Sequence, residues 1–287
     1  MNLNRCIVVI KQTALAQGGL PADLALRGDA TAHRIVLADT EHQRTIELVR
    51  KVLGEHKIAF SETSLVNADA RLKGQLAIAD LIISVGGDGT LLNSSHYVRG
   101  GAMLGVNSAP GDSVGHFCSV NRKSFEQKLD SILKGKWKPR ELARLQVILD
   151  EKVLPELALN DVLIAHDCPA ATTRYLIKVG RREEEHRSSG VWVSTAAGST
   201  AGIRSAGGKV MPLGSRRIQF LVRELYREPK RAYQLTRGFV EPDEEIVIAS
   251  KMAKGELYID GARTFYEFPF GTRARIERAQ TSLRLFL

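Results

Sequence analysis

A short apolar run that ends in a glycine-rich turn constrains the fold of this chain most strongly. The run is Leu81–Val85, the turn is Gly86–Thr90, and the stretch Leu91–Val98 continues with helical periodicity. Apolar runs of this length are typical of buried strands, so the segment predicts a strand–turn–helix unit. Three glycines in four positions let the backbone turn tightly and present consecutive N–H groups. We therefore expect an α/β layer with an anion-binding turn at the end of one strand.

The first half of the chain alternates apolar runs with stretches of helical periodicity, which is typical of a doubly wound α/β layer. Strands are predicted at 7–10, 81–85 and 102–106, and helices at 41–56, 91–98 and 124–135. Ser124 and Gln127 have the spacing of a capping box at the start of the last helix.

After about residue 139 many short strand-like runs are separated by turn residues, which predicts a mainly β domain. These runs are 145–149, 157–165, 175–179, 191–194, 246–249, 257–259, 264–268 and 274–278. Apolar residues at helical spacing between Ile218 and Leu225 predict a helix, and Asp260-Gly261 predicts a two-residue hairpin turn. The expected fold class is α/β plus β, with a doubly wound α/β domain over 1–137 and a mainly β domain over 138–287.

Composition narrows the class of protein. The 287 residues are 44% hydrophobic and 25% charged, as in soluble globular proteins. No apolar run approaches the roughly 20 residues of a membrane span, and the apolar start is too short for a signal peptide, so a cytoplasmic protein is expected. Three widely spaced cysteines argue against a disulfide framework and a zinc site, and no metal-ligand set is predicted.

The net charge of +9 suits nucleic acid, an anionic membrane or a phosphorylated small molecule equally well. Only 6% of the residues are aromatic and the basic residues are scattered, which disfavours a nucleic-acid surface. No amphipathic membrane-docking stretch is evident either. A small-molecule partner is therefore expected, with no nucleic acid and no membrane.

Asp88 is unusual because it is an acid inside an anion-binding turn. A carboxylate repels a phosphate there unless it accepts a proton from a nucleophile or helps hold a divalent cation. Phosphoryl transfer requires an oriented hydroxyl and a neutralised phosphate. The alternative is a plain turn in which Asp favours the bend. The chain lacks GxxxxGK[ST], and the turn does not fit GxGxxG, which disfavours a Walker-type ATPase and a Rossmann dehydrogenase.

Two segments of the β half also carry polar groups. Segment 194–208 packs small and hydroxyl residues around glycine, so it either approaches a phosphate or ribose closely or forms a flexible surface loop. Asn160 and Asp161 stand side by side among apolar neighbours. Adjacent strand side chains point to opposite faces, so at least one of the two needs a polar partner. They form either a strand-end turn or a pair that binds ribose hydroxyls.

In this order, Gly86–Thr90, Leu104–Asn107, Leu159–Asp161 and the 198–208 loop resemble the NAD kinase family. The resemblance runs from about Leu81 to the end of the chain. Within the family, the stretches at 115–118, 187–190, 227–229 and 260–261 are most similar to the mitochondrial-type branch. It implies an N-terminal α/β domain and a C-terminal β-rich domain with the active site between them. It also implies phosphorylation of the adenosine 2′-hydroxyl of NAD by ATP with Mg²⁺, giving NADP.

The resemblance further implies a role for each matching residue. Asp88 would take the proton from the 2′-hydroxyl, and such a base typically contributes about 10²–10⁴-fold. Binding roles for ATP, Mg²⁺ or NAD are implied for Gly86, Gly87, Gly89, Thr90, Asn160, Asp161, Arg187, Ser189, Thr200, Ala201 and Ser205. By the same analogy, a homodimer or larger homo-oligomer is expected.

Three positions depart from the family pattern. Asp161 stands where Glu is usual, and Ser189 stands where most bacterial members carry Asp. Gly202 replaces the usual aromatic residue, and the loss of that ring is expected to weaken ligand binding by about 1 kcal/mol. Two alternative functions stay open, a diacylglycerol-type lipid kinase that shares GGDGT and a non-catalytic nucleotide-binding regulator. His116 is expected to be structural near the site, and Trp137 and Trp192 to be packing residues.

Overall fold

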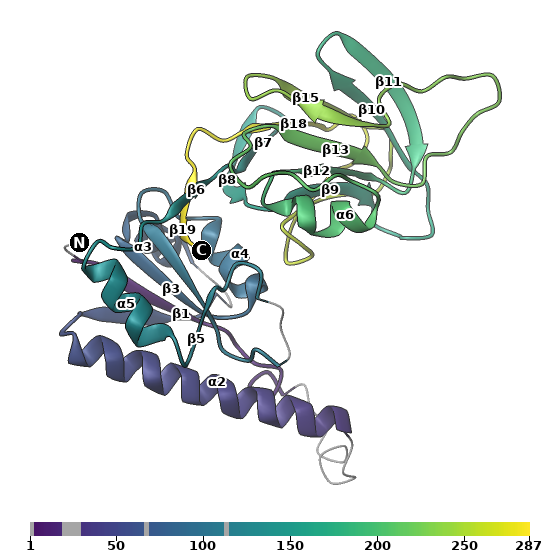
Figure 1. Cartoon of the computed structure of the whole chain (residues 1–287). Coiled ribbons are helices and arrows are strands. Elements are labelled where there is room, and N and C mark those ends of the chain that lie inside the picture. The colour runs from purple at the N-terminus through teal and green to yellow at the C-terminus, as the bar shows by residue number, and fades with distance from the viewer. Residues whose placement is uncertain (1–2, 19–29, 66–68, 112–114) are drawn as a thin grey trace. The chain divides into compact units, whose positions relative to one another are not determined.

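The structure is a computed structural model that describes residues 3–18, 30–65, 69–111 and 115–287 (Figure 1). Met1 and Asn2 lie outside the described residues; they belong to the start of the chain, which the sequence analysis judged too short in apolar residues for a signal peptide. The chain divides into two compact units. Unit 1 comprises Met1–Arg140 and Leu283–Leu287, and unit 2 comprises Glu141–Ser282.

Unit 1 is built on a seven-stranded sheet with the order β2-β1-β3-β4-β19-β6, in which β5 pairs with β4 and β6 runs from Arg140 into the first residues of unit 2. Its strands are β1 (Cys6–Ile10), β2 (Phe60–Thr63), β3 (Leu81–Gly86), β4 (Ala102–Asn107), β5 (Val120–Asn121), β6 (Arg140–Leu142) and β19 (Leu283–Phe286). Its helices are α2 (Ala30–Glu55), α3 (Ala70–Ile78), α4 (Asp88–Ser95) and α5 (Phe125–Leu133). The pairings of β1 with β2 and β3, and of β4 with β3, β5 and β19, are parallel.

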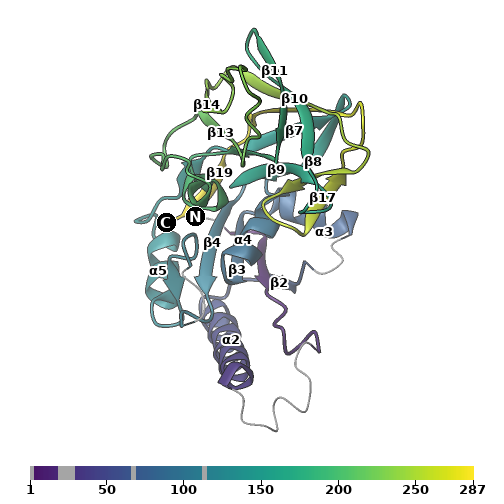
Figure 2. The ribbon, with the colours of Figure 1, turned by 90° about the vertical axis from the view of Figure 1, so that its right-hand side faces the viewer.

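The helices of unit 1 cover both faces of this sheet. The apolar faces of α2 and α5 pack with β1, β3 and β4 in one core, on the same side of the sheet (Figures 1 and 2). On the other side, Leu91 of α4 lies against Gly105 of β4, where a Cβ would come within 2.7 Å of the leucine side chain. Every residue of β3 and β4 is buried, which explains why their sequences are apolar apart from Ser84 and Asn107.

Unit 2 is a sandwich of two antiparallel six-stranded sheets, with the orders β11-β10-β15-β18-β7-β8 and β14-β13-β12-β9-β16-β17. The first sheet contains β7 (Leu145–Leu149), β8 (Lys152–Ala158), β10 (Thr173–Val179), β11 (Arg182–Ser188), β15 (Glu245–Ser250) and β18 (Arg273–Arg278). The second contains β9 (Asp161–His166), β12 (Val191–Ser194), β13 (Ile218–Val222), β14 (Arg237–Val240), β16 (Gly255–Ile259) and β17 (Thr264–Glu267). Alternate residues of both sheets share one core.

The α/β plus β fold class is confirmed, but several local expectations are wrong. Residues 218–222 form strand β13 instead of a helix, because all five are buried between β12 and β14, and an apolar run of that kind has no decisive period. Ser124 precedes α5, but its side chain makes no capping bond to the helix. Ile259 pairs with Thr264, so the loop at Asp260 has four residues instead of two.

Two boundaries also differ from the sequence expectation. The last strand, β19, returns to unit 1 and pairs with β4, although the sequence assigns everything after residue 137 to one domain. Helix α2 begins at Ala30, eleven residues before the expected start. Ala32 is the buried residue of that first stretch, so no apolar stripe marks it. No helix in the described part of the chain has the length and apolarity needed to cross a membrane.

Candidate active site

The glycine turn lies at the carboxyl end of β3, in the middle of the parallel sheet of unit 1. Gly86 pairs with Asn107 at the end of the neighbouring strand β4. A Cβ on Gly86 would lie 2.7 Å from Thr90 Oγ1 and 2.9 Å from the Lys11 Cβ, so the turn needs glycine there. A Cβ on Gly89 would meet no atom of the described residues within 4 Å. Ligands of open α/β sheets bind at this edge.

Asp88 begins helix α4, with Gly87 at the N-cap. Both oxygens of its carboxylate accept backbone N–H groups, Oδ2 from His116 at 2.7 Å and Oδ1 from Phe117 at 2.8 Å. Asp88 thus binds a different loop and does not cap its own turn. His116 contributes through its backbone, in line with the structural role expected from the sequence. Burial and the negative charge of Asp88 raise the pKa of the nearby Cys118 thiol.

In unit 2, Leu159, Asn160 and Asp161 form the turn from β8 into β9, and the Asp260 carboxylate holds it. Asp260 accepts the N–H groups of all three residues, at 2.8, 2.7 and 3.0 Å. The sequence analysis treated Asp260 as a turn residue and missed this contact. No local signal in the sequence marks this contact, because it joins residues about 100 positions apart.

The side chains of Asn160 and Asp161 are polar, and their burial is not balanced by hydrogen bonds or by a positively charged partner among the described residues. Asn160 Oδ1 is buried and has no hydrogen-bond partner among the described residues. Asp161 is only 6% exposed, and burial together with the negative charge of Asp260 raises the pKa of Asp161 to about 8. Near neutral pH this carboxyl is therefore largely protonated and able to donate a hydrogen bond. An unpaired amide oxygen beside a neutral acid suits a ligand with both donors and acceptors, such as a ribose.

The small-residue loop after β12 packs directly on this turn. The Asn160 carbonyl accepts the Thr195 N–H at 2.9 Å and the Ser194 hydroxyl at 3.1 Å. A Cβ on Gly198 would lie 2.6 Å from the Asn160 Cα and closer still to its carbonyl oxygen. The structure thus brings together two segments that the sequence analysis singled out separately, and the loop is not a free surface segment.

The remaining residues of this loop lie around two short helical turns, η1 (Gly198–Thr200) and α6 (Gly202–Ser205). Ser199 is fully buried and its hydroxyl accepts the Met211 N–H at 2.8 Å, so it is structural. Thr200 and Ala201 are half-buried at the junction of η1 and α6, and Ser205 is exposed at the end of α6.

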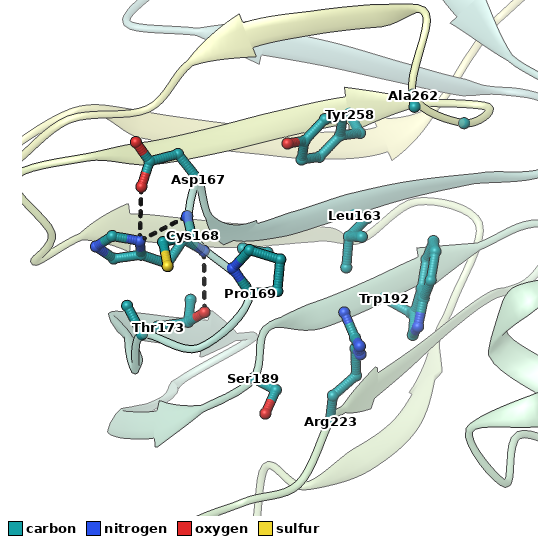
Figure 3. A pocket seen from close by; sticks show the side chains of 14 residues that line it. Leu163, Asp167, Cys168, Pro169, Thr173, Ser189, Trp192, Arg223, Tyr258 and Ala262 are labelled. Atoms are coloured by element: carbon teal, nitrogen blue, oxygen red, sulfur yellow. Dashed lines mark hydrogen bonds and ion pairs between the residues drawn. The ribbon is translucent and has the colours of Figure 1, made fainter.

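A pocket of about 410 Å³ opens on the outer face of the sheet that contains β9 and β12 (Figure 3). Ser189, Trp192, Arg223 and Tyr258 line it. Leu163 and Ala165 of β9 line it too. Their side chains point to the same face of the strand as that of Asp161, while Val162 and Ile164 point to the opposite face, into the core. Of the residues selected from the sequence, Ser189 lies in this pocket. Arg187 is exposed on the edge strand β11 and does not line it.

Trp192 presents a half-buried indole to this pocket, so it is not a fully buried core residue. The guanidinium carbon of Arg223 lies 5.9 Å from the centroid of its ring. A Cβ on Gly202 would lie 3.1 Å from the indole Cζ2, so an aromatic side chain at 202 would require Trp192 to move. By contrast, Trp137 packs on Phe286, with ring centroids 5.2 Å apart, as expected for a packing residue.

The site residues thus form two groups. The glycine turn with Asp88 belongs to unit 1. The Asn160–Asp161 turn, the small-residue loop and the Ser189 pocket belong to unit 2. In the described residues, no three His, Cys, Asp or Glu side chains gather in a way that could hold a metal ion.

Comparisons with known proteins identify the family. The chain is 35% identical over 268 residues to a probable NADH kinase of Oryza sativa subsp. japonica, covering 86% of this chain and 81% of the relative. The fold is similar to that of an NAD kinase from Archaeoglobus fulgidus solved in complex with ATP, with a TM-score of 0.71, 20% identity and coverage of 99% and 93% of the two chains.

A yeast NADH kinase solved with NADH is also similar in fold, with a TM-score of 0.73, 14% identity and coverage of 98% and 83%. A scan against protein-family models finds no match. The identity to the rice relative, over most of both chains, establishes the relationship that the motifs indicate. The chain is a kinase and belongs to the NAD kinase family.

Proposed function

We propose that this protein transfers the γ-phosphoryl group of ATP to the adenosine 2′-hydroxyl of NAD, giving NADP and ADP. The observation that carries the proposal is the Asp88 carboxylate, fixed by two backbone N–H groups beside a glycine turn. The backbone N–H groups of a glycine turn can bind the phosphates of a nucleotide, and a fixed carboxylate beside the turn can act as the base that takes a proton from an alcohol.

In this mechanism Asp88 accepts the proton of the 2′-hydroxyl as that oxygen attacks the γ-phosphorus. The bond from the γ-phosphorus to the bridging oxygen breaks, and ADP leaves with the electron pair. Gly86, Gly87, Gly89 and Thr90 supply the close backbone approach to the phosphates. Phosphoryl transfer of this kind depends mainly on positioning and on compensating charge.

A divalent cation fits the residues present. Mg²⁺ in such enzymes is held mostly by substrate phosphates, with one or two carboxylates, and so needs no cluster of protein ligands. Asp88 is the acid of the turn, fixed by two backbone N–H groups and close to the Cys118 thiol, and it would supply the carboxylate oxygen that the cation needs. When bound, the cation would neutralise charge on the phosphates.

Unit 2 would hold the dinucleotide. Asn160 and Asp161 would bind ribose hydroxyls, and Thr200, Ala201 and Ser205 would lie along the ligand. Ser189 in the pocket and Arg187 on β11 would contact the rest of the dinucleotide. The proposal includes a cytoplasmic homodimer or larger oligomer, by analogy with the family.

We expect purified protein with ATP and Mg²⁺ to phosphorylate NAD or NADH, and not a short-chain diacylglycerol. The relative named NADH kinase makes NADH the second candidate acceptor, so both dinucleotides are assayed in parallel at equal concentration. Separation of NADP, NADPH and phosphatidate by chromatography reads out all three reactions. Transfer to the lipid alone, or stabilisation by NAD without turnover, contradicts the proposal.

Trp192→Ala is expected to raise the KM for the dinucleotide about tenfold and to leave the KM for ATP unchanged. The half-buried indole offers a face on which a planar ring can stack, and aromatic pairs contribute about 0.5–1.5 kcal/mol beyond area burial. Initial-rate kinetics against both substrates measure the effect. Phe270→Ala is the control, since this phenylalanine is 72% exposed and does not line the pocket. Equal changes in the two variants would exclude stacking on Trp192.

A further inference from the structure

The Asp260 carboxylate collects three consecutive backbone N–H groups from residues about 100 positions earlier in the chain. Leu159 donates to Oδ2, and Asn160 and Asp161 both donate to Oδ1. In return, the Asp260 N–H donates to the Asp161 carbonyl at 3.0 Å. A charged acceptor forms stronger bonds than a neutral one, so this carboxylate fixes the path of the turn.

Strand pairing explains how Asp260 reaches the turn. β16 pairs with β9 and ends at Ile259, opposite Val162, so the next residue lies beside the start of β9. Asp260 adopts φ of 50° and Gly261 adopts φ of 107°, in the loop that leads to β17. Asp, Asn and Gly tolerate this left-handed region best, and of these only Asp offers two charged oxygens to the three amides.

The turn that Asp260 holds carries two polar side chains for which the described residues provide no hydrogen-bond partner to Asn160 Oδ1 or to the Asp161 carboxyl. Asn160 has its buried, unpartnered Oδ1, and no hydrogen bond of the Asp161 carboxyl to another described residue is found. Where these two groups point depends on the backbone between β8 and β9. That backbone is fixed by Asp260 on one side and by the loop at Thr195 and Gly198 on the other.

We propose that Asp260 is a positioning residue, whose carboxylate fixes the Leu159–Asp161 turn and thereby presents Asn160 and Asp161 to the dinucleotide. The inference rests on the proposed function, because it assigns the ligand of that turn. It adds a residue that acts through the backbone and touches neither substrate.

The charge of Asp260 has a second consequence for Asp161. Burial and this neighbouring charge keep Asp161 protonated up to about pH 8, and Asp260 is the charged group that acts on it among the described residues. If the neutral acid donates to the ligand, dinucleotide binding weakens as the pH rises through this value. Removing the Asp260 charge lowers the pKa of Asp161, so the weakening then begins at lower pH.

The test compares Asp260→Asn and Asp260→Ala with a matched control, Asp150→Asn. Asp150 also has a left-handed φ, of 44°, and its carboxylate accepts a backbone N–H, from Arg273 at 2.8 Å, but it lies in the turn between β7 and β8 of the other sheet. Steady-state kinetics give the KM for NAD and for ATP between pH 6 and 9.5. Hydrogen exchange of the Leu159, Asn160 and Asp161 amides, in protein without ligand, measures the turn directly.

We expect Asp260→Asn to raise the KM for NAD about tenfold and Asp260→Ala to raise it further, with the KM for ATP and the control unchanged. The rise in the KM for NAD with pH should begin at lower pH in Asp260→Asn. Asp161→Asn, which resembles the neutral acid, should remove that rise. The three amides should exchange faster in both Asp260 variants and at the wild-type rate in the control.

Three results separate the inference from the proposed function. If the wild-type protein phosphorylates no dinucleotide, the proposed function fails, and unchanged exchange of the three amides would also overturn the positioning role. If the wild-type protein is active and the Asp260 variants keep its KM for NAD and its pH profile, the inference alone fails. Equal losses for NAD and ATP, or the same loss in Asp150→Asn, would indicate general destabilisation and would also overturn it.

Discussion

Asp88→Asn is expected to lower kcat about 10²–10⁴-fold while the protein stays folded. The amide cannot take the proton from the attacking hydroxyl, and a positioned base contributes about that factor. It also leaves one of the His116 and Phe117 N–H groups facing an NH₂ group instead of an oxygen. Single-turnover kinetics with ATP and NAD measure the chemical step, and a thermal melt reports folding.

Asp80→Asn is the matched control for this variant. The Asp80 carboxylate also accepts two consecutive backbone N–H groups, from Asn4 and Arg5, both at 3.0 Å. It precedes β3, whereas Asp88 follows that strand, so the two acids lie at opposite ends of it. Asp80 accepts both N–H groups on Oδ2, whereas Asp88 uses both of its oxygens, so a purely structural role of Asp88 predicts that any loss of turnover follows a loss of thermal stability in either variant. Near wild-type turnover by Asp88→Asn would remove this residue from the proposed chemistry.

The sequence predicts a site best where the same residues determine both the local backbone and the proposed chemistry. The glycine turn after β3 could be predicted because a fully buried parallel strand is apolar throughout and the turn itself requires glycine. The mainly β character of the second domain was also predictable, from short strand-like runs separated by turn residues. Strand β13 was not, since a strand buried on both faces lacks the alternation that distinguishes it from a helix.

The residues that the sequence did not reveal act through distant partners. Asp260 looks like an ordinary turn residue until the pairing of β16 with β9 places it beside amides about 100 positions away. Trp192 resembles a core residue in sequence, because the strand around it is apolar on both sides. The indole lines a pocket on the outer face of its sheet, next to Gly202, which has no side chain to place over it. Such contacts depend on tertiary structure, and no local pattern encodes them.

Gly198→Ala is expected to raise the KM for NAD about a hundredfold and to destabilise the fold by about 3 kcal/mol. The new methyl group would lie 2.6 Å from the Asn160 Cα and would overlap the Asn160 backbone, so the backbone itself must shift. The Asn160 carbonyl is also bonded to Thr195 and Ser194, so the loop and the turn move together. A displacement of about 1 Å at a positioning element can cost about 10²-fold.

Gly214→Ala separates this steric effect from the entropy that any Gly→Ala change removes from the unfolded chain. Gly214 also lies in unit 2, and a Cβ there meets no atom of the part of the chain that the structure describes within 4 Å. We expect this control to be neutral or slightly stabilising, with an unchanged KM for NAD. Thermal melts and steady-state kinetics of both variants decide the matter. If Gly198→Ala behaves like Gly214→Ala, the loop is free to move away from Asn160, and the close packing of these two segments does not set the geometry of dinucleotide binding.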